Sequence, residues 1–190
     1  MNACESILGL NPYQGGKPIE ELERELGITN ITKLASNENP LGVSSKVIEA
    51  IKSSLSGINR YPDGNAFELK KAISDRLMVA SEMISLGNGS NELLELIARV
   101  FVCKKTDEVI FSQYAFVVYP LVTQALGATA KISPAKNYGH DLNAMLGLIN
   151  ENTKLIFVAN PNNPTGTFIS DEEVYSFLDK VPKHIPVVLD

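Results

Sequence analysis

The sequence predicts an α/β domain in which helices cover both faces of a mostly parallel sheet, a three-layer α/β/α sandwich. Over the second half of the chain, short apolar runs of strand length alternate with segments whose apolar residues recur at helical spacing. Turns rich in Gly, Asn and Pro separate these segments. The 190 residues are 44% hydrophobic and 21% charged, which is typical of a globular domain.

Three helices and two brief strands are expected in the first half of the chain. The helices are expected over residues 18–26, 45–55 and 66–77. Gly27 is expected to end the first helix, and Asn65 with Glu68 forms a capping-box pattern at the start of the third. The strands are expected over residues 31–35 and 83–86.

Strands and helices alternate through the second half. Strands are expected over residues 108–111, 130–133, 154–159 and 186–190. Helices are expected over residues 92–101, 115–126 and 141–150, and after Ser170, which forms a capping box with Glu173. Open α/β sheets bind their ligands at the edge formed by the carboxyl ends of the strands.

Two parts of the chain are expected, residues 1–35 as an N-terminal arm with a short helix and residues 36–190 as the first part of a large domain. The run Val187-Val188-Leu189 has the composition of a strand buried inside a sheet. A chain that stops on such a strand leaves it uncovered. The sequence is therefore interpreted as the N-terminal portion of a longer protein, truncated at a sheet strand.

Charge and composition argue against several classes of protein. Seventeen Lys and Arg residues stand against 22 Asp and Glu, so the net charge is −5, and nucleic-acid binding is not expected. The longest apolar run, residues 115–122, is shorter than the ~20 residues of a membrane helix, so no membrane span is expected. The start of the chain lacks a signal-peptide pattern, and Cys4 and Cys103 cannot form a disulfide framework. A cytoplasmic location is predicted.

The isolated histidines and most of the aromatic residues can be explained by solvent exposure or core packing. His140 and His184 are interpreted as solvent-facing loop residues, and no metal site is expected. Phe116 and Tyr119 stand three residues apart on a predicted helix, so both are expected to pack in the core. Tyr61 lies in a polar turn and is easier to place at an interface.

The glycine-rich turn at residues 87–92 follows a predicted strand and precedes a helix, where free backbone N–H groups form an anion site. Glu92 stands where a dinucleotide fingerprint needs Gly or Ala. The turn also lacks the Gly-Lys-Ser/Thr of a P-loop. A single phosphate remains as the natural ligand, and the alternative is an ordinary turn capped by Ser90.

Polar residues also follow the last two predicted strands. The loop of residues 160–166 contains three Asn and two Pro directly after a buried strand, so it offers amide donors at the carboxyl edge of the sheet. The alternative is that these residues serve only the turn. Asp190 ends an apolar strand, where a carboxylate is costly without a cationic or donor partner. The alternative role for Asp190 is a helix N-cap.

Several runs of residues, in their order along the chain, resemble the fold-type I pyridoxal-phosphate-dependent aminotransferases, and most closely the histidinol-phosphate aminotransferases among them. The runs are residues 11–13, 33–40, 60–64, 86–92 and 161–166, with Asp190. Asn-Glu-Asn-Pro, Tyr-Pro-Asp-Gly and Asn-Asn-Pro-Thr-Gly are the most specific motifs. The chain departs from the family's pattern at residues 114–119, although Phe116 matches an aromatic position. Residues 36–190 would then be the first part of the large cofactor-binding domain.

The resemblance implies a role for each matching residue toward pyridoxal 5′-phosphate and the substrate. Gly89, Ser90 and Asn91 would bind the cofactor phosphate. Phe116 would stack on the cofactor ring. Asn163 would donate to the phenolic oxygen, and Asp190 would pair with the protonated pyridine nitrogen. Tyr61 would reach the cofactor phosphate of a neighbouring subunit, which implies a homodimer, while Tyr13 and Asn37 would line the substrate pocket.

The reaction that the resemblance implies is amino transfer between small amino and keto substrates, histidinol phosphate and 2-oxoglutarate in this family. The family places its Schiff-base Lys and substrate-binding Arg after the position of Asp190, so residues 1–190 alone are expected to be inactive. An aromatic aminotransferase, a threonine-phosphate decarboxylase and a non-catalytic product of a truncated gene remain as alternatives.

Overall fold

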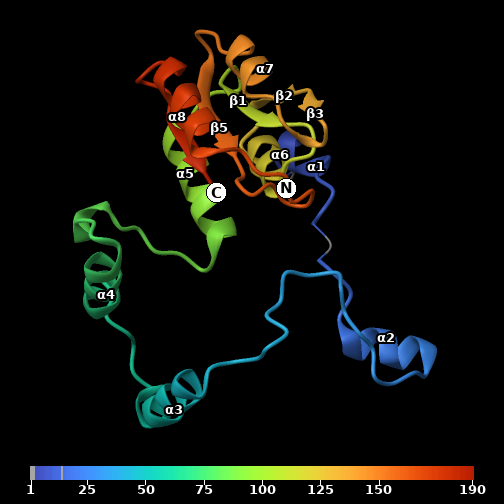
Figure 1. Cartoon of the computed structure of the whole chain (residues 1–190), viewed down its shortest axis with the longest axis vertical. Helices are drawn as coiled ribbons and strands as arrows, with labels where there is room; N and C mark the ends of the chain where they lie inside the picture. The colour runs from blue at the N-terminus through green and yellow to red at the C-terminus, as the bar shows by residue number, and fades with distance from the viewer. Residues whose placement is uncertain (1–2, 14) are drawn as a thin grey trace. The chain divides into compact units, whose positions relative to one another are not determined.

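The computed structural model describes residues 3–13 and 15–190, which fall into two compact units (Figure 1). One unit combines the start of the chain, up to Tyr13, with Leu86–Asp190. The other unit is the intervening segment, which ends at Ser85. The boundary at residue 35 between an arm and a large domain stays a prediction.

The first unit is built on a four-stranded parallel sheet with the strand order β2-β1-β5-β6. The strands are β1 (Glu108–Ser112), β2 (Thr129–Ser133), β5 (Thr153–Val158) and β6 (Val187–Leu189). Two very short strands, β3 (Ala135–Lys136) and β4 (Gly139–His140), form a separate antiparallel hairpin. The four strands predicted for this half of the chain are confirmed.

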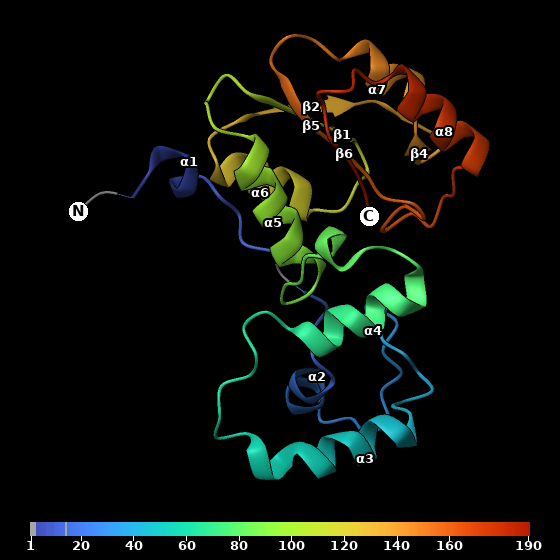
Figure 2. The same cartoon turned by 90° about the vertical axis from the view of Figure 1, so that its left-hand side faces the viewer.

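Helices cover both faces of this sheet (Figure 2). One face packs against α5 (Ser90–Phe101) and α6 (Val118–Ala125). The other face packs against α7 (Leu142–Gly147) and α8 (Asp171–Lys180). A short N-terminal helix, α1 (Glu5–Leu8), lies against α6, where the Ser6 hydroxyl donates to the Ala125 carbonyl oxygen. The three-layer α/β/α arrangement is therefore confirmed.

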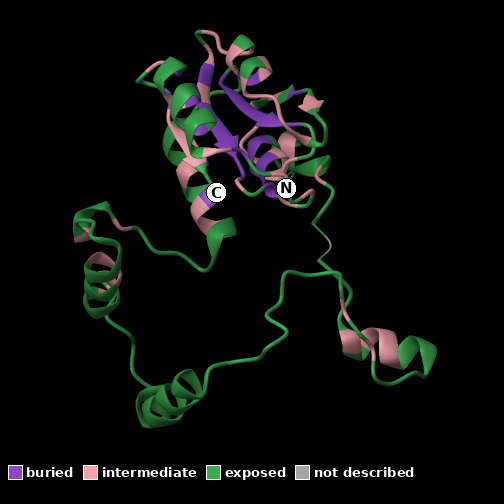
Figure 3. Cartoon of the chain, in the orientation of Figure 1, coloured by how far each residue is buried: buried purple, intermediate pink, exposed green. Residues whose placement is uncertain are grey.

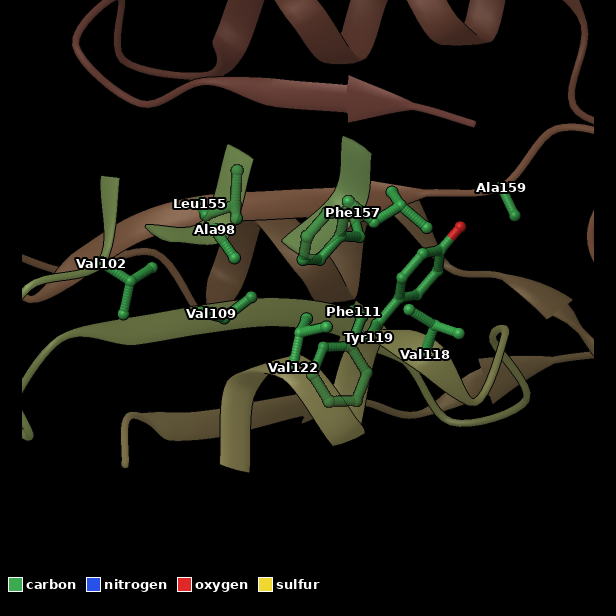
Figure 4. Packing of buried hydrophobic residues seen from close by; sticks show 11 residues of the cluster. Ala98, Val102, Val109, Phe111, Val118, Tyr119, Val122, Leu155, Phe157 and Ala159 are labelled. Atoms are coloured by element: carbon green, nitrogen blue, oxygen red, sulfur yellow. The ribbon is translucent and has the colours of Figure 1, made fainter. Parts of the chain in front are cut away.

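Each face of the sheet has its own hydrophobic core because successive strand residues point to opposite faces. Along β5, Leu155 and Phe157 join the core under α5 and α6, whereas Ile156 and Val158 join the core under α7 and α8. Figure 4 shows the first of these cores from close by. The uninterrupted apolar sequence of β5 follows from burial on both faces.

The second unit is helical and has no buried residue along its described length (Figure 3). Its α-helices are α2 (Ile19–Leu26), α3 (Ser45–Ser54) and α4 (Phe67–Leu77), and its 3-10 turns are η1 (Leu55–Gly57) and η2 (Ser81–Met83). As predicted, α2 ends at Gly27, which adopts the left-handed conformation with φ 66°.

The two strands predicted for the first half are wrong. Residues 31–35 form no strand, and residues 81–83 form the turn η2, followed by extended chain. The apolar runs have the composition of strands, but the structure gives them no neighbouring strand with which to form a ladder. Propensity alone therefore misled the prediction at both places.

The capping box predicted at Asn65 is also wrong. Ala66, with a φ of 49°, separates Asn65 from the first helical residue, Phe67. Asp63 serves this helix start instead, because its carboxylate accepts from the N–H groups of Asn65 at 2.9 Å and Phe67 at 3.0 Å. These hydrogen bonds hold the pKa of Asp63 below its ordinary value. The capping box of Ser170 and Glu173 at α8 is confirmed.

Candidate functional site

The carboxyl ends of β5 and β6 lie side by side, and two backbone hydrogen bonds join Asp190 to residues at the end of β5. The N–H of Asp190 donates to the carbonyl oxygen of Val158, and the N–H of Asn160 donates to that of Asp190, both at 2.9 Å. The parallel ladder thus extends one residue beyond β6. Asp190 therefore lies beside the start of the loop of residues 160–166, at the sheet edge where the sequence predicted it.

The side chain of Asp190 is held by a residue of the core. The hydroxyl of Tyr119 donates to Oδ2 of Asp190 at 2.7 Å, across 71 positions of sequence. The Tyr119 side chain is fully buried, and its ring stacks on Phe157 with 4.6 Å between centroids and 4° between planes (Figure 4). Burial, reinforced by the bond to the carboxylate, raises the pKa of the Tyr119 phenol, so it stays a protonated donor.

Core packing was predicted for Tyr119 and is confirmed, but its polar contact was missed. The sequence signal for this contact was a Tyr among neighbours without polar side-chain atoms. A buried phenol usually has a hydrogen-bond partner, so such a Tyr indicates a polar contact. Helix α6 begins at Val118 rather than at residue 115, so Phe116 lies in the turn before the helix. Phe116 is half-buried and packs against this core cluster, as predicted.

Aromatic contacts lead from the buried Tyr119 to the protein surface. The ring of Phe116 meets the ring of Tyr119 edge to face, with centroids 6.0 Å apart, and meets that of Tyr13 in the same way at 6.4 Å. Tyr13 is exposed. A continuous series of contacts therefore joins Tyr13, through Phe116 and Tyr119, to the carboxylate of Asp190.

Two of the three asparagines in the loop of residues 160–166 serve the loop itself. The Asn160 amide donates to the Ile169 carbonyl oxygen at 3.0 Å and accepts from the Ile169 N–H at 2.9 Å. Asn162 is 3% exposed and donates to the Tyr114 carbonyl oxygen at 3.0 Å and to Oγ1 of Thr165 at 2.7 Å. Asn160 therefore serves the turn, whereas Asn162 also ties the loop to Tyr114, and its Oδ1 is buried without a hydrogen-bond partner among the described residues.

Asn163 differs from its neighbours in this loop. It is half-buried, and no hydrogen bond joins its side-chain amide to any residue that the structure describes. The bonds of Asn160 and Asn162 fix the backbone on the N-terminal side of it, and the Gly166 N–H donates to the Asn162 carbonyl oxygen at 2.7 Å. The loop thus presents one amide that is free for a ligand.

The glycine-rich turn leads into α5 with its first N–H groups free. Gly89 is the N-cap residue, with a φ of 80° that favours glycine, and no side chain caps the helix. The alternative, a turn capped by Ser90, is therefore not what the structure shows. Glu92 instead folds back to accept from the backbone N–H and the amide of Asn88. Within the described residues, the N–H groups of Ser90 and Asn91 have no hydrogen-bond partner, which leaves the start of this 12-residue helix open to an anion.

Two other residues predicted for the site belong to the second unit. Asn37 and Tyr61 are part of the second unit, where both are exposed, and their roles stay predictions. His184 is exposed, as predicted.

The prediction for His140 is wrong, because His140 lies in β4 and is half-buried. Its Nε2 lies 2.8 Å from the Ala159 carbonyl oxygen, which can only accept, so Nε2 carries a hydrogen. The β3–β4 hairpin turns the ring toward the sheet, which the sequence did not reveal.

Neither a metal site nor a membrane span is found among residues 3–13 and 15–190. The described side chains include no cluster of three or more His, Cys, Asp or Glu that could hold a metal ion. None of the described helices combines the length and apolar composition that crossing a membrane requires.

Fold and site together define an α/β domain whose Asp190 and Asn163 stand at the carboxyl edge of a parallel sheet. The chain belongs to the aminotransferase class I and II family, whose model matches residues 29–190. Its similarity to known proteins extends well beyond the motifs described above.

Two curated relatives and one solved structure illustrate this similarity. Histidinol-phosphate aminotransferase 1 of Mannheimia succiniciproducens is 60% identical over 99% of this chain and 51% of its own length. Histidinol-phosphate aminotransferase 2 of Pasteurella multocida is 57% identical over 98% and 51%. The crystal structure of histidinol-phosphate aminotransferase from Sinorhizobium meliloti in complex with pyridoxal-5′-phosphate is 28% identical, with a TM-score of 0.88 over 99% of this chain and 50% of that one. The chain thus spans about half the length of these relatives.

Proposed function

We propose that the full-length protein containing this chain is a pyridoxal-phosphate-dependent aminotransferase that transfers an amino group between histidinol phosphate and 2-oxoglutarate. The observation that carries this proposal is the 60% identity to a histidinol-phosphate aminotransferase over 99% of this chain. The reaction fits the family to which the chain belongs.

The residues of the site have the chemistry that pyridoxal phosphate needs. The free N–H groups of Ser90 and Asn91 suit a phosphate, the unengaged amide of Asn163 suits a phenolic oxygen, and the carboxylate of Asp190 suits a pyridinium. The half-buried ring of Phe116 offers an aromatic surface. When bound, the cofactor supplies an electron sink for carbanion chemistry.

This chain's own residues have separable tasks in that reaction. Asp190 would hold a proton at the ring nitrogen, because an opposite charge nearby favours the protonated form of a base. Asn163 would donate to the phenolic oxygen and favour its deprotonated form. Gly89, Ser90 and Asn91 would anchor the phosphate, and Phe116 would fix the plane of the ring.

The remaining roles come from the same family resemblance. Tyr13 and Asn37 would line the substrate pocket, and Tyr61 would contact the cofactor phosphate of a second subunit in a homodimer. The exposure of Tyr13 and Tyr61 is compatible with contacts to a substrate or to another chain. The proposed substrates are small amino and keto compounds, the proposed location is the cytoplasm, and no nucleic-acid or membrane partner is proposed.

The test is amino transfer by the purified full-length protein loaded with pyridoxal phosphate. We expect kcat/KM with histidinol phosphate as donor and 2-oxoglutarate as acceptor to exceed the value with phenylalanine or tyrosine as donor. A higher kcat/KM for the aromatic amino acids would reassign the enzyme, and decarboxylation of threonine phosphate would do the same. The variant Asp179→Ala, on the exposed surface of α8, serves as a control for substitution itself.

A further inference from the structure

The buried hydroxyl of Tyr119 belongs to a side chain that packs in a hydrophobic cluster. Its cluster consists of buried apolar side chains from α5, α6, β1 and β5. A buried hydroxyl without a partner costs free energy, and a Phe would fill the same space without that cost. The hydroxyl has a partner only because its oxygen reaches Oδ2 of Asp190 at the sheet edge.

The ring of Tyr119 is held on several sides, so its hydroxyl has one position. Phe157 stacks on it at 4.6 Å, Phe116 meets it edge to face at 6.0 Å, and Phe111 lies against it at 6.4 Å. The side chain is fully buried, which prevents it from turning toward solvent. Because its pKa is raised by burial, the phenol remains a donor wherever the protein is folded near neutral pH.

Asp190 is consequently fixed at both its backbone and its side chain. Its N–H and carbonyl oxygen are bound to Val158 and Asn160, and Oδ2 is bound to Tyr119. Among the described residues, Oδ1 has no hydrogen-bond partner. One carboxylate oxygen is therefore used by the core while the other remains available.

We propose that Tyr119 is a positioning residue for the cofactor: by holding Oδ2 of Asp190, it keeps Oδ1 available for the protonated nitrogen of the pyridine ring. The inference rests on the proposed function and deepens it, because it assigns the orientation of this carboxylate to a residue that touches neither cofactor nor substrate. The hydroxyl of Tyr119 acts through its bond to Asp190.

The test measures how well the full-length apoprotein distinguishes a ring nitrogen from a carbon. The probes are pyridoxamine 5′-phosphate, which binds without a covalent bond, and its 1-deaza analogue, in which C–H replaces the ring nitrogen. The ratio of their dissociation constants, measured by titration calorimetry, reports the contact at the nitrogen and requires no turnover. Tyr119→Phe keeps the ring and its stacking, and Tyr175→Phe makes the same change at an exposed site of α8.

We expect the wild-type protein and Tyr175→Phe to favour the natural probe, and Tyr119→Phe to lose about tenfold of that preference, as is typical when a hydrogen bond to a charged group is removed. In an Asp190→Asn background, Tyr119→Phe should change the ratio no further, since residues that act through one contact are not additive. Thermal unfolding of each apoprotein checks that the variants are folded.

An unchanged ratio in folded Tyr119→Phe would overturn the inference while leaving the proposed function intact. A wild-type protein that does not distinguish the two probes would overturn the inference together with the role assigned to Asp190. A protein that behaves as expected here but does not act on histidinol phosphate would support the inference and contradict only the proposed substrate.

Discussion

The hydroxyl oxygen of Tyr119 lies 2.7 Å from Oδ2 of Asp190, so a residue at the centre of the core contacts the charged residue at the edge of the sheet. The same Tyr119 ring stacks on Phe157 of β5, whose strand also holds the backbone of Asp190 through Val158. Packing between α6 and the sheet therefore determines where the carboxylate points. A change in that packing would therefore alter the orientation of the Asp190 carboxylate.

Asp190→Ala in the full-length protein is expected to reduce amino transfer by more than tenfold while changing cofactor retention much less. In its proposed role the carboxylate acts on the charge of the ring nitrogen, whereas the proposed phosphate anchor at the start of α5 remains. Each ~1.4 kcal/mol lost at the transition state is a tenfold loss of rate. Steady-state kinetics and cofactor content after dialysis measure the two effects. Transamination within threefold of wild type would rule out this role of Asp190.

The sheet half of the fold was predictable because its strands and helices alternate with different periods. Local sequence is enough to predict two of its features. These are apolar strands buried on both faces, as in β5, and the Ser170–Glu173 capping box. The strands predicted at residues 31–35 and 83–86 failed because a strand needs a neighbour, which local sequence does not reveal.

The places of Asp190 and Asn163 in the fold were predictable from the sequence, but the contacts that support them were not. Asp190 and Asn163 stand at the predicted edge, yet the bond from Tyr119 spans 71 positions and the bond from Asn162 to Tyr114 spans 48. Such contacts depend on tertiary packing, so no spacing in the sequence indicates them. The same holds for His140, which the β3–β4 hairpin turns toward the Ala159 carbonyl.

Asn162→Ala is expected to destabilise the full-length protein by about 1–3 kcal/mol, because the Tyr114 carbonyl oxygen and the Thr165 hydroxyl lose the donor that the buried Asn162 amide gives them. Chemical denaturation followed by circular dichroism measures the free energy of unfolding. Asn163→Ala, one residue away, is the matched control and should cost less than about 0.5 kcal/mol, since its amide bonds to no described residue. Equal losses in the two variants would contradict the division of roles within this loop.

Asn163→Ala is expected to raise the pH at which the visible absorption of the bound cofactor changes. Loss of a donor to the phenolic oxygen disfavours the deprotonated form, so deprotonation requires a higher pH. Spectrophotometric titration of the loaded full-length protein measures this midpoint. Asn143→Ala, at an exposed position of α7, should leave it unchanged. A midpoint that Asn163→Ala does not move would make Asn163 only a residue of the turn.

His140 is expected to make the protein less stable as the pH falls. Burial lowers the pKa of His140, although the bond to the Ala159 carbonyl opposes this effect. The unfolded chain then takes up a proton near the ordinary pKa of about 6.5 while the folded protein does not, so stability declines as the pH falls from about 6.5 toward the lowered value. His140→Gln should reduce the change in melting temperature between pH 7 and pH 5. His184→Gln, at an exposed site, should not reduce it. Identical profiles for both variants would contradict the effect.

The second unit presents an apolar stripe on α3 and η1. Val47, Ile51 and Leu55 share one helix face and are 48%, 56% and 54% exposed. Apolar side chains at this spacing normally pack against another element. In the second unit no described residue is buried, so these helices have not formed a core of their own.

Residues 1–190 produced alone are therefore expected to self-associate and to catalyse no amino transfer. Exposed apolar surface of this kind drives association. The family resemblance implies that the Schiff-base Lys and the substrate-binding Arg follow the position of Asp190. Light scattering over a range of concentrations measures the mass, and a coupled assay measures glutamate formation. Ile51→Lys, which places a charge within the stripe, should reduce association, whereas Ser53→Lys, on the opposite face of α3, should not. A monomer at all concentrations would contradict the first expectation, and measurable turnover would contradict the second.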